Sequence, residues 1–301
     1  MSVGAPPDPF AAAGQVWGLP PPDPLAMARD GFAGFAALIA ANLRHAGALR
    51  IDHVLGLRRL FLVPEGARGS DGTYLDFPFH HLLGQLTLAS VRARCLIVGE
   101  DLGTVPDGIR DRLNEARVLS YRVLWFERDG PTFRPPATWP ALAAACVSTH
   151  DLPTLAGWWN GADIAEQRDL GFLDNQTVAT ARQERQTEKA ALVAFARAEG
   201  VADGAATLDA TDPPDAAMHA LIAATPCVLA LVQADDLASE PIGVNLPGTD
   251  TERPNWRRRL RMPVAALFGS PDTSPALTAM RSAGRANGPA WVKPPDGTKD
   301  P

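Results

Sequence analysis

Hydrophobic residues are concentrated in short continuous runs along this chain, and four of these runs have the length of buried strands. They are Ala48–Ile51, Cys95–Val98, Ala144–Val147 and Cys227–Val232. Each run is four to six residues long and ends abruptly in polar residues. Continuous rather than alternating hydrophobicity is typical of strands buried on both faces of a parallel sheet, although turns of buried helix give the same pattern.

Segments with helical spacing lie between these runs. We expect helices at Phe32–His45, Pro78–Arg94 and Pro106–Ala116, with Pro106 in the first helical position. Val118–Phe126 is a further strand candidate. Strand and helix therefore alternate, which favours an α/β architecture.

The C-terminal half has a different pattern. Asn175–Glu199 has the spacing of a long surface helix, and Val201–Asp215 has the composition of a loop. A short helix is expected near Leu277–Arg285, followed by a disordered tail at Pro294–Pro301.

Charge and composition exclude several classes of partner. The chain has 301 residues, with 28 Lys and Arg against 34 Asp and Glu, a net charge of -6. This balance argues against binding to nucleic acid or to an anionic membrane surface. Residues 1–10 have neither a basic start nor an apolar stretch, and no apolar run is long enough to span a membrane. We expect a cytoplasmic enzyme.

The sequence carries no signature of a metal or an organic cofactor. Cys95, Cys146 and Cys227 each lie inside an apolar run, without a neighbouring Cys or His pair, and are expected to be buried thiols. Neither a phosphate-binding glycine loop nor an HExxH motif is present. No cofactor is therefore expected.

Three of the expected strands end at a carboxylate: Asp52, Glu100 and Asp151, at intervals of 48 and 51 residues. In a parallel barrel, such residues meet at the C-terminal face, where active sites lie. Arg50 lies two residues before Asp52, on the same face of the strand, and is placed to pair with it.

Converging carboxylates suit glycoside chemistry, which needs one ionised nucleophile and one protonated acid. Metal-dependent hydrolases also gather acids and histidines at a barrel mouth, so the spacing alone leaves both classes open. An Asp that follows a strand is more often a turn former or a helix cap, and Asp101 and Asp107 are assigned to that class.

Longer motifs decide between glycoside chemistry and metal-dependent hydrolysis. The strings LRIDHVLGLRRLFLVPEG (Leu49–Gly66), IVGEDLGTVP (Ile97–Pro106) and VSTHDLPTLAGWWNG (Val147–Gly161) closely resemble the 4-α-glucanotransferases, the amylomaltase or disproportionating-enzyme family, which are relatives of the α-amylases. GQVWGLP (Gly14–Pro20) and VNLPGT (Val244–Thr249) match as well. The resemblance extends from about residue 3 to about residue 265.

The resemblance implies a (β/α)₈ barrel and a retaining double displacement on α-1,4-glucans. By position in the motifs, Asp52 corresponds to the nucleophile and Glu100 to the general acid and base. Asp151 corresponds to the carboxylate that grips sugar hydroxyls and stabilises the transition state.

Four further residues match substrate-binding positions of the family. Arg50 corresponds to a residue that supports the nucleophile, and His150 to one that binds the same sugar. Gln15 and Trp17 match a loop beside the bound glucan, where an indole offers an apolar face to a sugar ring. Asn245, Asn255 and Trp256 are expected to be structural or supporting residues.

The resemblance also implies a domain organisation. Residues 1–265 are expected to form the C-terminal part of the barrel, about strands 4 to 8, with 1–30 as a substrate-binding loop region. Residues 266–301 are expected to hold a helix and the tail. The first three strand–helix units of the family are not in this chain, so a non-catalytic fragment that needs a missing N-terminal segment is an alternative. An α-glucan hydrolase is another.

Overall fold

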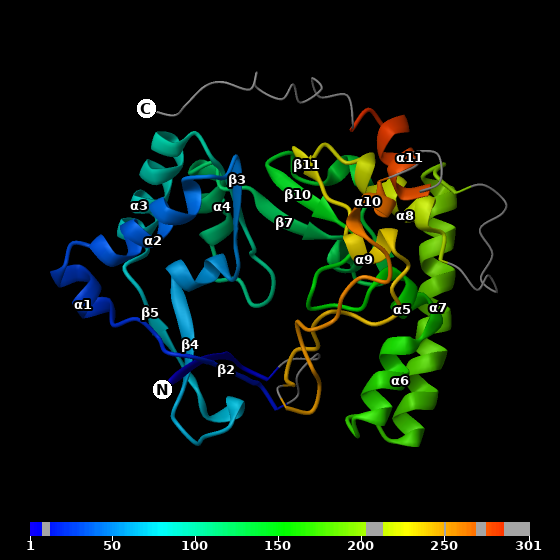
Figure 1. Cartoon of the computed structure of the whole chain (residues 1–301), viewed down its shortest axis with the longest axis horizontal. Coiled ribbons are helices and arrows are strands. Elements are labelled where there is room, and N and C mark those ends of the chain that lie inside the picture. The colour runs from blue at the N-terminus through cyan, green and yellow to red at the C-terminus, as the bar shows by residue number, and fades with distance from the viewer. Residues whose placement is uncertain (8–12, 203–212, 250, 269–274, 286–301) are drawn as a thin grey trace.

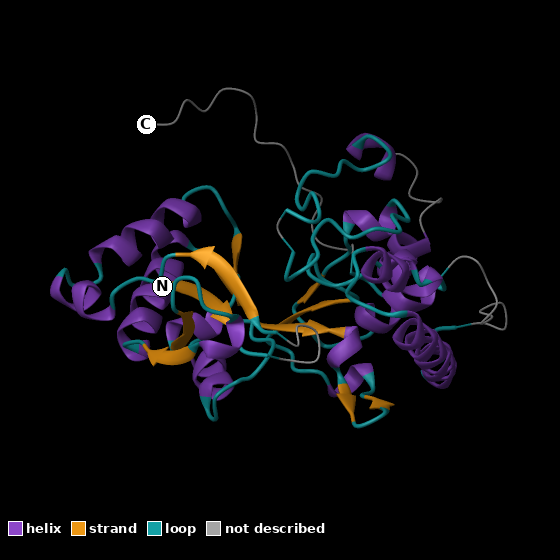
Figure 2. Ribbon diagram, turned by 90° about the horizontal axis from the view of Figure 1, so that it is seen from below, coloured by secondary structure: helices purple, strands orange, loops and turns teal. Residues whose placement is uncertain are grey.

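The computed structural model describes residues 1–7, 13–202, 213–249, 251–268 and 275–285. The expected tail at Pro294–Pro301 and most of the expected loop at Val201–Asp215 lie outside these ranges. Figure 2 shows helices gathered at both outer sides of the molecule and most of the strands between them. No helix of the described ranges is long and apolar enough to cross a membrane.

Five parallel strands lie side by side in the order in which they occur in the sequence (Figure 1). They are β3 (Ala48–Ile51), β6 (Leu96–Gly99), β7 (Ser120–Val123), β10 (Ala143–Cys146) and β11 (Leu229–Ala230). β3 pairs with β6, β7 pairs with β10, and β10 pairs with β11, all in parallel. A parallel bridge between Val98 and Leu119 joins the two groups. The expected α/β architecture is therefore confirmed.

Helices cover the outer face of β3 and β6. α2 (Ala33–Leu43) and α3 (Phe79–Ala93) match the expected ranges to within two residues at each end. α4 (Ile109–Glu115) begins three residues after Pro106, so the expected helix start is wrong. Gly108 precedes α4 with a φ of 74°, a left-handed conformation that glycine adopts without strain and that interrupts the helix before Ile109.

A second sheet, antiparallel, has the strand order β2-β1-β4-β5. Its strands are β1 (Ser2–Ala5), β2 (Gln15–Leu19), β4 (Arg59–Val63) and β5 (Thr73–Asp76). Residues 1–30 are therefore not simply a loop region as expected, because they also form two strands and the helix α1 (Pro24–Arg29). The strand β1 is fixed by its pairing with β4, which lies far away in sequence. A Cβ on Gly4 would lie 2.1 Å from the Gln15 carbonyl oxygen, so glycine permits this close pairing.

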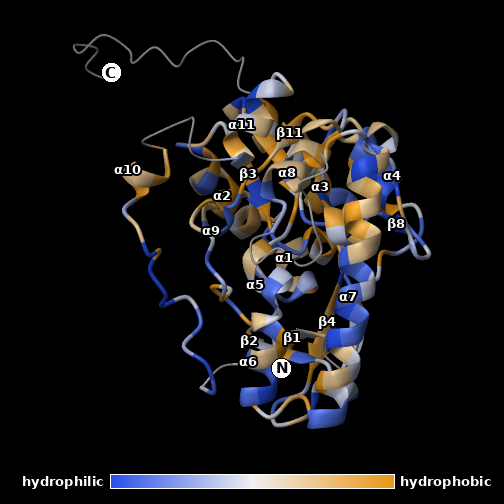
Figure 3. Ribbon diagram, turned by 90° about the vertical axis from the view of Figure 1, so that its right-hand side faces the viewer, coloured by the Kyte–Doolittle hydropathy of each residue, from blue (hydrophilic) through white to orange (hydrophobic). Residues whose placement is uncertain are grey.

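The C-terminal half is mostly helical. Its helices are α5 (Leu155–Asn160), α6 (Ala162–Asp169), α7 (Asn175–Ala198), α8 (Asp215–Ala223), α9 (Ala234–Leu237), α10 (Val264–Leu267) and α11 (Pro275–Ser282). A short hairpin joins β8 (Arg128–Asp129) to β9 (Thr132–Phe133). Four 3₁₀ turns complete the elements, at Val54–Leu57, Gly69–Asp71, Leu124–Phe126 and Pro136–Thr138. Polar and apolar positions both occur along α7 (Figure 3), as its expected surface location requires.

Three clusters of buried apolar residues form the core. One lies among α2, α3 and the outer faces of β3 and β6, and a second lies among α5, α7, α8 and β10. Trp158 and Trp159 belong to the second cluster, so these two indoles are core residues. The third cluster contains Val98, Tyr121 and Ala144, on the other face of the parallel strands. The three cysteines are buried free thiols, as expected.

Candidate active site

The parallel strands bring the three predicted acids to one edge of the sheet. Asp52 directly follows β3, Glu100 directly follows β6, and Asp151 lies five residues beyond β10. Strands that run in the same direction end at the same edge, which explains how residues separated by about 50 positions meet. This order of strands places the three predicted acids at the same edge of the sheet.

Asp52 forms an ion pair with Arg50. The Arg50 Nη1 lies 2.7 Å from Asp52 Oδ1, as their shared face of β3 predicts. The Asp52 side chain is 64% exposed and that of Arg50 is 28% exposed. The Asp52 carboxylate is therefore open to an incoming molecule while its guanidinium partner lies deeper in the site.

Glu100 is held by two backbone amides. The amide of His53 donates to Glu100 Oε2 at 2.8 Å, and the amide of Leu102 donates to Oε1 at 2.7 Å. Burial raises the pKa of Glu100 above its ordinary value, and the negative charge of Asp52 adds to the rise. The two amides and Arg50 oppose this shift without cancelling it. Glu100 is therefore the carboxyl of this site that is suited to hold a proton.

Asp151 has two hydrogen-bond partners. His150 Nε2 lies 3.0 Å from Asp151 Oδ2, and Asn245 Nδ2 donates to Asp151 Oδ1 at 2.7 Å. Burial alone would raise the pKa of Asp151, but the hydrogen bonds from His150 and Asn245 outweigh it, so the pKa lies below its ordinary value. The same contact with Asp151 raises the pKa of His150. The environments of Asp151 and Glu100 thus shift the pKa values of these two carboxyl groups in opposite directions.

Arg50 links the three acids electrostatically. Besides pairing with Asp52, its charge lowers the pKa of Glu100, Asp151 and His150. Its guanidinium carbon lies 4.8 Å from the centre of the Tyr121 ring. Arg50 therefore lies at the centre of the cluster.

Gln15 and Trp17 reach the same site from β2. The Trp17 ring packs edge-on against the ring of His53, with centroids 5.3 Å apart. Trp17 Nε1 donates to Gln15 Oε1 at 3.1 Å. Since His53 directly follows Asp52, the exposed Trp17 indole lies beside the acids, and the structure brings all seven predicted site residues together.

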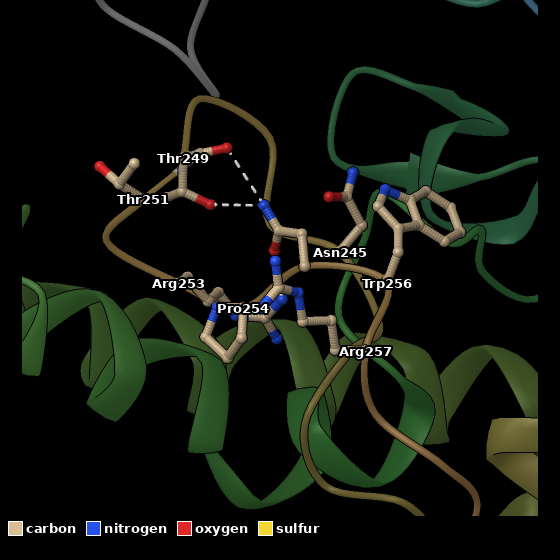
Figure 4. Close-up of a pocket in the computed structure, with 8 residues that line it drawn as sticks. Asn245, Thr249, Thr251, Arg253, Pro254, Trp256 and Arg257 are labelled. Carbon is tan, nitrogen blue, oxygen red and sulfur yellow. Dashed lines mark hydrogen bonds between the residues drawn. The ribbon is translucent and has the colours of Figure 1, made fainter.

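A pocket of about 560 Å³ adjoins Asp151. It is lined by Asn245, Thr249, Thr251, Arg253, Pro254, Asn255, Trp256 and Arg257. Figure 4 shows Asn245 and Trp256 at one side of this pocket and Thr249 and Thr251 at the other. The exposed Trp256 ring also lies 5.2 Å from the His150 ring, so the pocket opens next to the acids.

The neighbouring Asp101 is not the ordinary turn residue that the sequence predicts. Its side chain is 1% exposed and accepts hydrogen bonds from Ser120 Oγ at 2.6 Å, from the Tyr121 amide at 2.9 Å and from Arg110 Nε at 2.9 Å. It therefore ties the loop that carries Glu100 to the next strand, β7. Asp107 is exposed, in agreement with its assignment.

Sequence reasoning did not assign three contacts of the site. Asn245 and Trp256 were expected to be structural or supporting residues, and the structure identifies their partners as Asp151 and His150. Tyr121 was not singled out, because its position in a strand candidate has no motif around it. Its alternation with the polar Ser120 and Arg122 was the one signal that it faces the interior of the parallel strands.

Comparison with known proteins identifies the family of this chain. A family model described as 4-alpha-glucanotransferase matches residues 1–264. The 4-alpha-glucanotransferase of Haemophilus influenzae is 38% identical over 274 residues, which are 89% of this chain and 39% of that protein. That of Mycobacterium bovis is 38% identical over 278 residues, covering 90% of this chain and 37% of that protein.

A solved structure is similar as well. The crystal structure of amylomaltase from Corynebacterium glutamicum superposes with a TM-score of 0.86 at 32% identity, covering 93% of this chain and 42% of that one. This likeness indicates a barrel fold of the glycoside hydrolase type, of which the chain contains a part. The chain spans about two fifths of the length of these relatives. It belongs to the 4-alpha-glucanotransferase family.

Proposed function

We propose that this chain carries the catalytic groups of a 4-α-glucanotransferase, which moves a glucanosyl unit from one α-1,4-glucan to another. Its five parallel strands correspond to strands 4 to 8 of a (β/α)₈ barrel. In the first step, Asp52 attacks the anomeric carbon while Glu100 gives its proton to the leaving 4-oxygen. In the second, Glu100 takes the proton of an acceptor 4-hydroxyl, whose oxygen displaces Asp52 from the sugar.

The observation that carries this proposal is the contrast between Asp52 and Glu100. Asp52 is exposed and paired with Arg50, which favours a carboxylate ready to attack. Glu100 is held by backbone amides, and burial raises its pKa, which favours an acid that still holds its proton. A retaining double displacement requires these two states on neighbouring carboxyl groups.

Asp151, His150 and Asn245 supply the sugar-binding groups of the proposal. The hydrogen bonds that lower the pKa of Asp151 keep it ionised beside the reacting sugar. A carboxylate stabilises the positive charge that develops on the sugar in the transition state. His150 shares this carboxylate and offers a ring nitrogen to a hydroxyl group.

Exposed indoles supply the apolar faces that glucose rings need. Trp17 lies on the Asp52 side of the site and Trp256 on the His150 side. Sugar rings present C–H groups that pack on such faces, while the indole N–H donates to hydroxyl groups. We assign Trp17 and Gln15 to glucan binding on this basis.

A second candidate function is that of a fragment without activity of its own. The observation behind this second candidate is an apolar side chain that the fold leaves exposed. Leu96 is 46% exposed, although it lies on the same face of β6 as the buried Val98. Among the described residues, β3 and β11 each pair with one parallel neighbour. A strand with an unpaired edge and an apolar side chain in water favours completion by further strands.

Incubation of the purified chain with maltotriose tests the proposal. Separation of the products by length should show a ladder of longer and shorter maltooligosaccharides, and Asp52→Asn should abolish it. Asp76→Asn is the matched control, because Asp76 is also exposed and its Oδ1 lies 2.7 Å from an Arg58 nitrogen, outside the site. Glucose and maltose without longer products would indicate a hydrolase. A folded chain without any product would indicate the fragment.

A further inference from the structure

Tyr121 lies directly under the active-site arginine. It belongs to β7 and is 7% exposed, between Ala144 on one neighbouring strand and the site on the other side. Its ring centre is 4.8 Å from the guanidinium carbon of Arg50. A cation at this distance from an aromatic face is attracted by the ring, and more strongly when water is excluded.

Arg50 has few other groups to hold it in place. Its Nη1 is paired with Asp52, while its buried Nε has no hydrogen-bond partner among the described residues. The ion pair by itself is a weak restraint, because Asp52 is largely exposed and solvent screens the attraction. The position of the guanidinium therefore depends on the ring beneath it.

Tyr121 itself is held at both ends. Its backbone amide donates to Asp101 Oδ1, and the buried Asp101 carboxylate is fixed in turn by Ser120 and Arg110. At the other end, its hydroxyl group is buried beside the thiol of Cys146, and this burial, followed by the neighbouring thiol, raises the pKa of Tyr121. The ring is thus a rigid support that connects the loop of Glu100 to Arg50.

We infer that Tyr121 is a positioning residue of this active site: its ring holds the Arg50 guanidinium against Asp52, and Asp101 anchors the ring. The ring, rather than the hydroxyl group, performs this role. The inference rests on the proposed function for its effect on turnover, whereas the placement of Arg50 by Tyr121 is testable without activity.

The decisive comparison is between Tyr121→Phe and Tyr121→Leu, measured by ¹⁵N relaxation of the arginine Nε–H groups. The Arg50 signal is identified by its loss in Arg50→Lys. It should be rigid in the wild type and in Tyr121→Phe, and mobile in Tyr121→Leu. An Arg50 side chain that stays rigid in folded Tyr121→Leu overturns the inference.

Tyr74→Leu is the matched control. Tyr74 also carries an arginine over its ring, with the Arg59 guanidinium carbon 3.8 Å from the ring centre, on the antiparallel sheet. Its replacement should loosen Arg59 and leave the Arg50 signal unchanged. If Tyr121→Leu does not fold, the inference is tested on the wild-type protein. Protons of the Arg50 side chain should then show nuclear Overhauser effects to protons of the Tyr121 ring. An Arg50 side chain that is mobile in the wild type contradicts the inference.

Kinetics on maltotriose separate the two proposals. Tyr121→Leu should lower kcat by about tenfold with a smaller change in KM, because Arg50 acts on the nucleophile rather than on sugar binding. Tyr121→Phe should retain the wild-type kcat. A wild-type chain without transfer refutes the proposed activity of this chain but leaves the relaxation result valid. Unchanged kcat in Tyr121→Leu, with an active wild type, refutes the positioning role.

Discussion

Asn245 donates a 2.7 Å hydrogen bond to Asp151 across 94 residues of the chain. This amide brings the segment after α9 into the site, next to the loop that follows β10. It also gives Asp151 a donor that, unlike His150, carries its proton at every pH. The pKa of Asp151 therefore depends on Asn245, which belongs to a segment remote in sequence.

Replacing Asn245 should alter stability in a pH-dependent way. The lowered pKa of Asp151 means that its stabilising contribution is complete above the ordinary Asp value of about 3.9 and is lost as the pH falls through the lowered value. Asn245→Ala should therefore reduce the free energy of unfolding at pH 6, and the difference from the wild type should shrink in strong acid. Denaturant unfolding between pH 2 and pH 7 measures this.

A control for that series is Asn42→Ala. Asn42 donates to the Leu38 carbonyl on an exposed part of α2, a contact with no titratable partner. Its effect on unfolding should be independent of pH over the same range. If the change in the free energy of unfolding caused by Asn245→Ala were also independent of pH, the amide would not act through Asp151.

The raised pKa of Glu100 should be visible in the pH dependence of transfer. If Glu100 is the acid, kcat/KM on maltotriose declines as this group loses its proton, and burial moves that decline above the ordinary Glu pKa of about 4.3. Glu100→Gln should lower kcat by about 10²- to 10⁴-fold and abolish this limb of the profile. A decline centred at or below pH 4.3 would contradict the assignment.

Asp236 should destabilise the fold at neutral pH. Its Oδ1 accepts the Leu155 amide at 2.9 Å, but its Oδ2 is buried without a partner among the described residues, and burial raises its pKa to about 6. A raised carboxyl pKa weakens the folded state as the pH rises from about 4 to above 6.

Asp236→Asn keeps the acceptor for Leu155 and removes the titration. Relative to the wild type, its free energy of unfolding should increase by up to about 3 kcal/mol between pH 4 and pH 8. Thermal or urea unfolding at the two pH values measures the change. Equal differences at both pH values would mean that the Asp236 carboxyl is not perturbed in the folded protein.

The helix α3 offers a matched test of the core. Leu86 is 0% exposed among the residues between α2 and α3, whereas Leu88 on the same helix is 45% exposed. Leu86→Ala should lower the free energy of unfolding by about 2–5 kcal/mol, through lost burial and the cavity it leaves. Leu88→Ala should change it by less than about 1 kcal/mol. Comparable losses would contradict this packing.

Trp17 should contribute to glucan binding rather than to stability. Trp17→Ala should raise KM for maltooligosaccharides and leave the melting temperature nearly unchanged, because the indole is exposed. Val16→Ala removes another exposed apolar side chain of β2 and should leave KM unchanged. Equal KM values for Trp17→Ala and the wild type would exclude the indole from binding.

The sequence predicted the parallel strands because each lies within a short, mainly apolar segment. β3 and β10 match their predicted runs to within one residue. The positions of Asp52 and Glu100 could be predicted for the same reason, since each directly follows the last residue of its strand. The pairing of Arg50 with Asp52 followed from strand periodicity alone.

Other features depend on contacts between distant segments. The strands β1 and β2 lie in a Pro- and Gly-rich region, where local pattern indicates loops. They form because β1 pairs with the distant β4, and β2 pairs with β1. The hydrogen bond from Asn245 to Asp151 and the support of Arg50 by Tyr121 likewise join segments that no local pattern connects. Motif resemblance could mark Asn245 as relevant, but only the fold shows its partner.

The hydrogen bond from the His53 amide to Glu100 has a consequence for how this protein can diverge. The nucleophile candidate and the acid candidate are joined through one backbone amide, adjacent to Asp52, rather than through side chains. Side-chain substitutions do not remove a backbone donor. Most of them should therefore leave the spacing of the Asp52 and Glu100 carboxyl groups unchanged. Under the proposed function, glucan specificity can then change at Trp17, Trp256 and the pocket around Thr249 while Asp52 and Glu100 keep their relative positions.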